Sequence, residues 1–208
     1  MRRVVLVLTV AAVAAGIWLS AARSQDQVEE PSTKEVFPRT VEFEYNGTDY
    51  ELQVTGVAVR KKFFVKVYAI AHYMDMEVAD FKDILKALDT VLSDSYAKQI
   101  TLDFVRDVGV DDIQKAYRSG FEKNATDEEK EVIAPFVEQF LGYFTKDVEK
   151  GDQYILRWIP DGIVLATVNG ETYGPIANVT FAKALWRIWL GDKSPVDRKK
   201  LVEMAVED

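Results

Sequence analysis

Two Asn-Gly pairs restrict the fold of this chain more than any other feature of its sequence. Asn46-Gly47 lies between two runs in which apolar and polar residues alternate, and Asn169-Gly170 follows two further apolar runs at residues 154–159 and 163–168. Both residues of such a pair tolerate positive φ, which a two-residue hairpin turn requires. The sequence therefore predicts a largely antiparallel sheet built from local hairpins, with a further strand at residues 98–105.

Residues 56–75, GVAVRKKFFVKVYAIAHYMD, form a strand-like apolar segment with an arginine and two lysines in its middle. The odd-numbered residues from 63 to 73 are expected on the sheet core. If the chain were extended between Arg60 and Tyr68, these two residues would lie roughly 26 Å apart. A turn at Lys61-Lys62 would reduce this to roughly 16 Å, so that both side chains reach one anionic group. A shared site thus depends on a turn.

Apolar residues recur at helical spacing in several later segments. These are residues 79–92, a segment capped by Asp111 or Asp112, a segment from Thr126 onward, residues 181–190, and a last segment starting at Ser194-Pro195. Thr126 and Glu129 match a capping box, and Pro135 should bend or split the helix that follows. Hairpins in one part and helices in blocks predict an α+β domain rather than a doubly wound fold.

The N-terminal segment is expected to lie outside this domain. Residues 1–22 contain two arginines, an apolar run and three small residues, which is the layout of a cleaved signal peptide. The run is also about long enough to span a bilayer, so an uncleaved membrane anchor is the alternative. We expect a periplasmic or secreted protein, with residues 23–36 as a flexible tether and residues 37–208 as one domain.

Composition excludes many kinds of site. The chain has no cysteine and one histidine, His72, which rules out cysteine nucleophiles and multi-histidine zinc sites. The formal charge is −8, and removal of two arginines with residues 1–22 gives −10. No basic patch follows from this, so the composition does not favour nucleic acid as a partner. No metal site or cofactor is predicted, and a lone His72 in a strand is more often structural than catalytic.

Two stretches resemble the chalcone isomerase superfamily. "GVAVR" followed by "FFVKVYAIAHYMD" is similar to two core strands of that superfamily, and "FAKALWRIWLGDKSPVDRKKL" is similar to its final helix and the segment after it. Between them, "GDQYILRWIPDGIVLATVNGETYG" resembles the exported bacterial members. The resemblance covers residues 40–205. It implies an open-faced β-sandwich of chalcone isomerase type, in which helices cover a large antiparallel sheet and a ligand cleft lies between them.

The resemblance also implies a ligand site. Arg60 matches an arginine that the ligand-handling branches place at the cleft, and Tyr68 matches a tyrosine of the fatty-acid-binding members, where the isomerases carry threonine. We therefore expect non-catalytic binding of a fatty-acid-like or other amphipathic carboxylate. The expected apolar lining comes from strands 63–74 and 163–168 and from Phe136, Phe140, Leu185 and Trp189.

An intramolecular lyase or isomerase is the alternative, with Arg60 stabilising an oxyanion and Tyr68 or Tyr117 transferring a proton. The isomerases that this sequence resembles contact their substrate through polar side chains at three positions, which correspond here to approximately Asp112, Ser119 and Ile188. Because the isomerase side chains are missing at these positions, the resemblance does not favour chalcone cyclisation. Tyr117 remains a candidate because it offers a phenol at a position shifted from that of the isomerase tyrosine.

Two readings without a ligand also stay open. Arg60 at the rim of the sheet would pair with a helix acid such as Asp112. Separately, the domain as a whole is open to interpretation as a scaffold that keeps the fold without any ligand.

Overall fold

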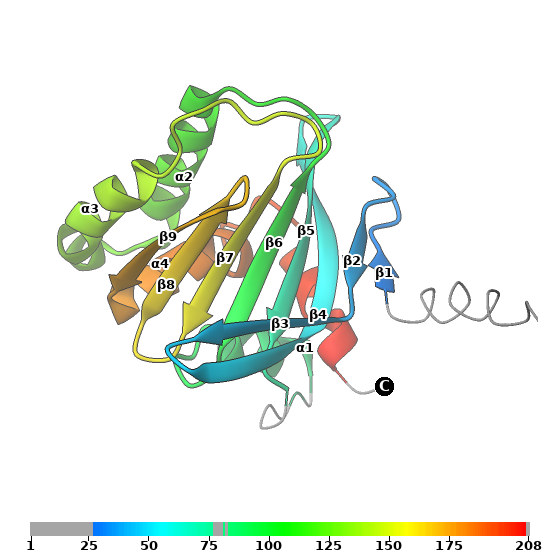
Figure 1. The fold of residues 1–208 in the computed structure, drawn as a ribbon, viewed down its shortest axis with the longest axis horizontal. Helices are drawn as coiled ribbons and strands as arrows, with labels where there is room; N and C mark the ends of the chain where they lie inside the picture. Colours follow the sequence, from blue (N-terminus) through cyan, green and yellow to red (C-terminus); the bar gives the residue numbers. More distant parts are fainter. Residues whose placement is uncertain (1–26, 77–80, 82, 207–208) are drawn as a thin grey trace, which may run out of the picture.

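The computed structural model describes residues 27–76, 81 and 83–206, so the predicted signal peptide lies outside the described residues. Its centre is a seven-stranded antiparallel sheet in which each strand pairs with the next one in the chain (Figure 1). The strands are β3 (Thr40–Tyr45), β4 (Thr48–Lys62), β5 (Val65–Met74), β6 (Lys98–Phe104), β7 (Gln153–Ile159), β8 (Ile163–Val168) and β9 (Glu171–Ala177). The predicted sheet of local hairpins is confirmed, including positive φ at Asn46 and Asn169.

Among the described residues, four α-helices and two 3₁₀ turns accompany the sheet. They are α1 (Ile84–Thr90), α2 (Val110–Asn124), α3 (Asp127–Leu141), α4 (Val179–Leu190), η2 (Arg198–Leu201) and η3 (Glu203–Ala205). The capping box of Thr126 and Glu129 is confirmed at the start of α3. Pro135 lies inside α3, which is continuous rather than split.

Three predicted helix starts differ from the structure. The helix predicted from residue 79 begins at Ile84, because the side chain of Asp83 accepts hydrogen bonds from the first turn. Gly109, rather than Asp111 or Asp112, caps α2. The predicted last amphipathic helix is absent among the described residues after α4, since the hydroxyl of Ser194 bonds within its own loop and only the two 3₁₀ turns follow.

Residues 27–36 are not the flexible tether that their composition predicts. β1 (Gln27–Glu29) pairs with β2 (Val36–Pro38), and the turn between them closes around the buried carboxylate of Glu30. Burial alone would raise the pKa of Glu30. Hydrogen bonds from Thr33 and Ser32 outweigh this effect and leave the pKa below its ordinary value.

The sheet separates two apolar clusters. On β5, the even-numbered Ile70 and Met74 pack into the larger cluster under the helices. The odd-numbered Ala69, Ala71 and Tyr73 pack into a smaller cluster around Phe37, on the opposite face of the sheet. The odd-numbered face is therefore core, as predicted, from residue 69 onward. The main core, however, lies on the even-numbered face, which carries the polar residues of interest.

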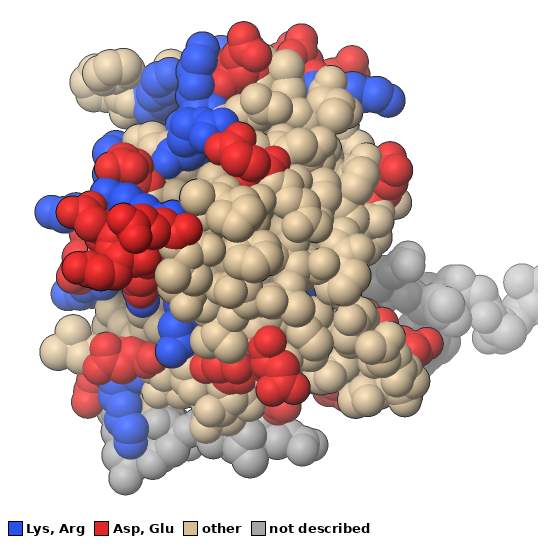
Figure 2. All heavy atoms as spheres, turned by 90° about the vertical axis from the view of Figure 1, so that its left-hand side faces the viewer, with Lys and Arg blue, Asp and Glu red and all other residues tan. Residues whose placement is uncertain are grey.

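Charged residues on the helices form ion pairs at the surface. Arg118 and Lys130 bridge to Glu138 and Glu122, respectively. Figure 2 views the side where α3 and the β8–β9 edge lie and shows acidic and basic residues in mixed groups beside a broad uncharged area. Within the described residues, no helix is long and apolar enough to cross a membrane.

Candidate functional site

Arg60 and Tyr68 lie directly opposite each other on neighbouring strands. The chain reverses at Phe63-Phe64, and Arg60 of β4 pairs with Tyr68 of β5. The predicted turn at Lys61-Lys62 is therefore wrong by two residues, because these lysines still belong to β4. Residues paired across antiparallel strands point to the same face with Cβ atoms about 5 Å apart. The two side chains are thus closer than the sequence suggested.

The guanidinium of Arg60 contacts only backbone carbonyls. Its NH1 donates to the carbonyl oxygen of Lys61 at 2.6 Å and to that of Pro195 at 3.2 Å. Among the described residues it forms no ion pair, and Asp112 lies exposed on α2. The expected alternative of a rim arginine paired with a helix acid is therefore not what the structure shows. Arg60 keeps an uncompensated positive charge at the edge of the sheet.

The hydroxyl of Tyr68 points toward α4. It accepts a hydrogen bond of 2.9 Å from Nε1 of Trp189, and its ring packs edge-on against Phe104. Burial raises the pKa of Tyr68, while the Trp189 bond and the charge of Arg60 partly oppose that rise. The phenol therefore stays protonated at neutral pH, and no acceptor for its proton exists in the described part of the chain.

Tyr117 of α2 completes the cluster. Its ring is 6% exposed, stacks on Phe144, and meets the ring of Trp189 with centroids 5.9 Å apart. Its hydroxyl is buried without a hydrogen-bond partner. Burial raises the pKa of Tyr117 well above its ordinary value, and the nearby Tyr68 adds to this. A buried unsatisfied hydroxyl costs about 1–3 kcal/mol, so the protein maintains this group at the expense of stability.

Tyr68 and Tyr117 therefore lie together between the sheet and the helices, and Arg60 is the cross-strand neighbour of Tyr68 at the edge of the sheet. Arg60 supplies a charge, and two neutral phenols supply O–H donors that face an apolar interior. Such an arrangement suits the oxygens of an anion. It offers no general base, because the pKa of both phenols is raised. The sequence analysis expected Trp189 only as an apolar residue and missed its hydrogen bond to Tyr68. The bond could have been anticipated, because a buried indole N–H normally requires an acceptor.

His72 is engaged elsewhere in the core. Its Nε2 accepts from Nε1 of Trp186 at 3.3 Å, so its Nδ1 carries the proton and donates to the hydroxyl of Thr55 at 2.6 Å. That hydroxyl in turn donates to the carbonyl of Leu201. Burial, with a contribution from Lys98, lowers the pKa of His72 to about 3. His72 is thus a neutral and fully hydrogen-bonded core residue, in agreement with its structural interpretation.

The side chains expected to line an apolar cleft instead pack against one another. Phe140, Leu185 and Trp189 are buried, and the ring of Phe140 contacts those of Tyr117 and Phe181. The reason is that the aromatic residues of α2, α3 and α4 are large enough to meet across the space above the sheet. Within the described residues, no three metal-ligating side chains form a cluster.

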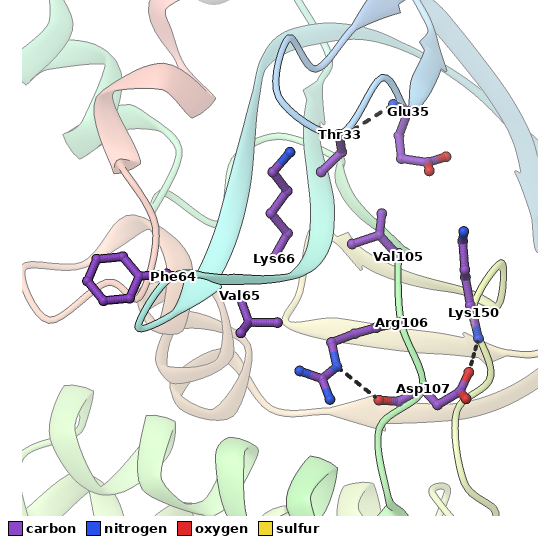
Figure 3. A pocket seen from close by; sticks show the side chains of 9 residues that line it. All are labelled: Thr33, Glu35, Phe64, Val65, Lys66, Val105, Arg106, Asp107 and Lys150. Atoms are coloured by element: carbon purple, nitrogen blue, oxygen red, sulfur yellow. Dashed lines mark hydrogen bonds between the residues drawn. The ribbon is translucent and has the colours of Figure 1, made fainter.

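Two grooves lie outside this core. One, of about 880 Å³, has a mixed polar and apolar lining of Thr33, Glu35, Phe64, Val65, Lys66, Val105, Arg106, Asp107 and Lys150 (Figure 3). The other, of about 340 Å³, lies on the sheet face away from the helices and includes Tyr73. The hydroxyl of Tyr73 is also buried and unpartnered, and burial raises its pKa. Tyr73 and Tyr117 thus present equivalent groups on opposite faces of the sheet.

Comparison with known proteins identifies the family. The family model described as chalcone isomerase-like matches residues 34–202. The chain belongs to the chalcone isomerase-like family. Among solved structures, a fatty-acid binding protein from Arabidopsis thaliana superposes with a TM-score of 0.68 at 15% identity, over 86% of this chain and 97% of that chain. At this identity the likeness shows the fold, which is the predicted α+β architecture. No curated protein sequence matches the chain.

The polar positions that the resemblance implies at Asp112, Ser119 and Ile188 do not meet at the cluster. Asp112 and Ser119 are exposed on the outer face of α2, whereas Tyr117 points inward. Ile188 of α4 is buried, with its side chain next to Gly120. The phenol at the cluster is therefore Tyr117, and no second polar group from these positions joins it.

Proposed function

We propose that this protein is an exported, non-catalytic member of the chalcone isomerase-like family that binds a fatty-acid-like amphipathic carboxylate. The head group would accept hydrogen bonds from Arg60, Tyr68 and Tyr117. The buried, unpartnered hydroxyl of Tyr117 carries this proposal, because it lies close to the phenol of Tyr68, which pairs across the sheet with Arg60. A bound carboxylate would satisfy all three donors at once.

The tail would enter between the sheet and the helices α2, α3 and α4. Aromatic rings occupy that space in the structure, so entry requires rings such as those of Phe140 and Phe144 to change rotamer. Most of the surrounding cluster is apolar, and the buried polar residues His72 and Lys98, which contact it at Trp186 and Trp158, already have hydrogen-bond partners. Burial of an acyl chain there is favourable by about 0.8 kcal/mol for each methylene, which offsets the cost of the rearrangement.

Two further observations support the proposal. A protein of the same fold is a fatty-acid binding protein. The proposal that the protein is exported is supported by the layout of residues 1–22, which is that of a signal peptide. If this segment is not cleaved, it would anchor the protein in the membrane. N-terminal sequencing of the protein from its host distinguishes the two, since export with cleavage predicts a new N-terminus near residue 23.

Removal of the donors should weaken ligand binding. We expect Arg60→Ala to raise the Kd for palmitate by at least about tenfold, because a charge-assisted hydrogen bond is lost. Tyr117→Phe should raise it by about fivefold. Trp189 contacts both tyrosines, so titration of tryptophan fluorescence with palmitate is the measurement.

Tyr73→Phe is the matched control, because it removes an equivalent hydroxyl from the other face of the sheet. Its Kd should equal that of the unmodified protein. Tyr117→Phe should in addition leave the ligand-free protein as stable or more stable, since an unsatisfied hydroxyl is removed. An equal loss of affinity in Tyr73→Phe, or unchanged affinity in Arg60→Ala, contradicts the proposed site.

Isomerase activity is the second candidate, favoured by one observation. Arg60 and two neutral phenols resemble the donors that stabilise an oxyanion during ring closure. We nevertheless expect chalcone to cyclise in the presence of the protein at its spontaneous rate, because Asp112 and Ser119 face solvent and Ile188 is apolar. The absorbance of chalcone, followed with and without protein, checks this. Acceleration that Tyr117→Phe abolishes would establish the enzyme instead.

A further inference from the structure

The tip of the β4–β5 hairpin exposes large apolar side chains. Phe63 is 89% exposed, Phe64 is 98% exposed and Val65 is 48% exposed. In Figure 3 the ring of Phe64 projects away from the other labelled residues of the adjacent groove. The surfaces of soluble proteins rarely expose adjacent aromatic rings that pack against no other side chain. Exposed apolar patches of this kind mark sites of association with proteins or membranes.

The tip also has an unfavourable backbone conformation for its sequence. Phe63 adopts φ 58°, in the left-handed region that glycine or asparagine normally occupies in a turn. The β3–β4 and β8–β9 hairpins use Asn46-Gly47 and Asn169-Gly170 at their turns, and the β7–β8 hairpin uses Asp161-Gly162. The two phenylalanines therefore neither stabilise the conformation of this turn nor contribute to the apolar core. This indicates that they contact something outside the folded domain.

Basic residues surround these rings. Lys61, Lys62 and Lys66 are all exposed, and the stretch from residue 60 to residue 66 contains no acid. None of these three lysines forms an ion pair with a described residue. Arg106 and Lys150 line the groove beside the tip, together with the acids Glu35 and Asp107. In a chain with a formal charge of −8, this concentration of positive charge is local.

We propose that residues 61–66 dock the protein on an anionic lipid surface, with Phe63 and Phe64 inserted at the level of the head groups. Aromatic rings are favoured at the membrane interface, and nearby lysines are attracted to anionic lipids. Charge complementarity selects this partner, because exposed lysines precede and follow the two phenylalanines in a chain whose net charge is negative, although Lys66 also donates to the carbonyl of Ser32. Arg60 and Tyr68 lie at the base of the same hairpin, so docking would bring the proposed carboxylate site next to the membrane.

The absence of cysteine allows a direct test in the full-length chain. Val65→Cys introduces a unique thiol at the tip, which is labelled with an environment-sensitive NBD fluorophore. We expect a blue shift and a rise in emission on addition of phosphatidylcholine vesicles that contain phosphatidylglycerol. The matched control is Leu85→Cys, at an exposed apolar position on α1, whose emission should not change. Because the signal is local, an inserted N-terminal segment does not produce it.

Two variants in the Val65→Cys background separate the contributions. Phe63→Ser with Phe64→Ser should reduce the apparent affinity for these vesicles by at least about tenfold. Substitution of Lys61, Lys62 and Lys66 by Gln should reduce it by about fivefold for each charge, with a weaker dependence on salt. Circular dichroism checks that each variant folds.

Unchanged NBD emission on anionic vesicles overturns the proposal, as does an unaltered response after both phenylalanines are replaced. An equal response to pure phosphatidylcholine vesicles contradicts the assigned role of the lysines. The membrane proposal and the carboxylate site fail independently, because Tyr117→Phe should leave the NBD response intact while it weakens palmitate binding.

Discussion

Gly56→Ala should destabilise the domain by about 3 kcal/mol or more, because a methyl group at this position has no space. A Cβ atom on Gly56 would lie 2.0 Å from the carbonyl oxygen of Lys200 and 2.7 Å from the carbonyl carbon of Leu201. Both are backbone atoms of the C-terminal segment, which crosses β4 at this point. The segment would have to move away, with loss of the hydrogen bond from Thr55 to Leu201 and exposure of the buried Leu201 and Val202.

Urea unfolding provides the measurement, and hydrogen exchange of residues 198–206 shows whether the C-terminal segment detaches first. Gly109→Ala is the control, since its Cβ would meet nothing nearer than a side-chain oxygen of Asp147 at 3.9 Å. The control should change the free energy of unfolding by less than about 1 kcal/mol. If the two variants unfold at the same urea concentration, the close packing of the C-terminal segment on β4 is not important for stability.

Lys98 should make the stability of the protein depend on pH. Its side chain is fully buried, its Nζ lies 3.7 Å from the centre of the Trp158 ring, and it donates to the carbonyl of Ser93. Burial lowers the pKa of Lys98 to about 7, partly opposed by Asp94 and assisted by the charge of Lys183. The unfolded chain therefore binds more protons than the folded one between pH 7 and the ordinary lysine pKa. Stability should rise with pH across this range.

Lys98→Met should remove this dependence. From pH 7 to about 9, the free energy of unfolding of the unmodified protein should increase by an amount on the order of a few kcal/mol, while that of the variant stays flat. His72 contributes little to this slope, because it is neutral in the folded state and mostly neutral in the unfolded state above pH 7. Lys183→Met keeps the buried ammonium and should preserve most of the slope. Urea unfolding at several pH values checks these expectations, and an identical slope in Lys98→Met would contradict them.

Local patterns of sequence were sufficient for most strands and for part of the helix layout. β8 begins and ends at the predicted residues, and the capping box of Thr126 and Glu129 marks the start of α3, because both features depend on neighbours in the chain. The turn at Phe63-Phe64 was displaced by two residues for the opposite reason. Neither phenylalanine favours a turn, so the conformation is imposed by the pairing of β4 with β5.

The C-terminal segment shows the same limit. Ser194-Pro195 has the composition of a helix start, yet η2 begins after Asp197 and its last residue is buried against β4. Contacts with a strand more than 140 residues away in the sequence decide this geometry. Residues 27–36 likewise pair as β1 and β2 only because Phe37 finds a buried position against the sheet.

By itself, the sequence determined the α+β class and the hairpin order of the sheet, because these depend on periodicity and turn chemistry. The family resemblance singled out Arg60 and Tyr68 as candidates for a ligand site. Only the tertiary structure decided that Tyr117 joins them and that Trp189 binds Tyr68, since α2 and α4 reach the sheet through side-chain packing. It also decided that Asp112 faces solvent, because the orientation of α2 depends on which of its sides is apolar enough to be buried.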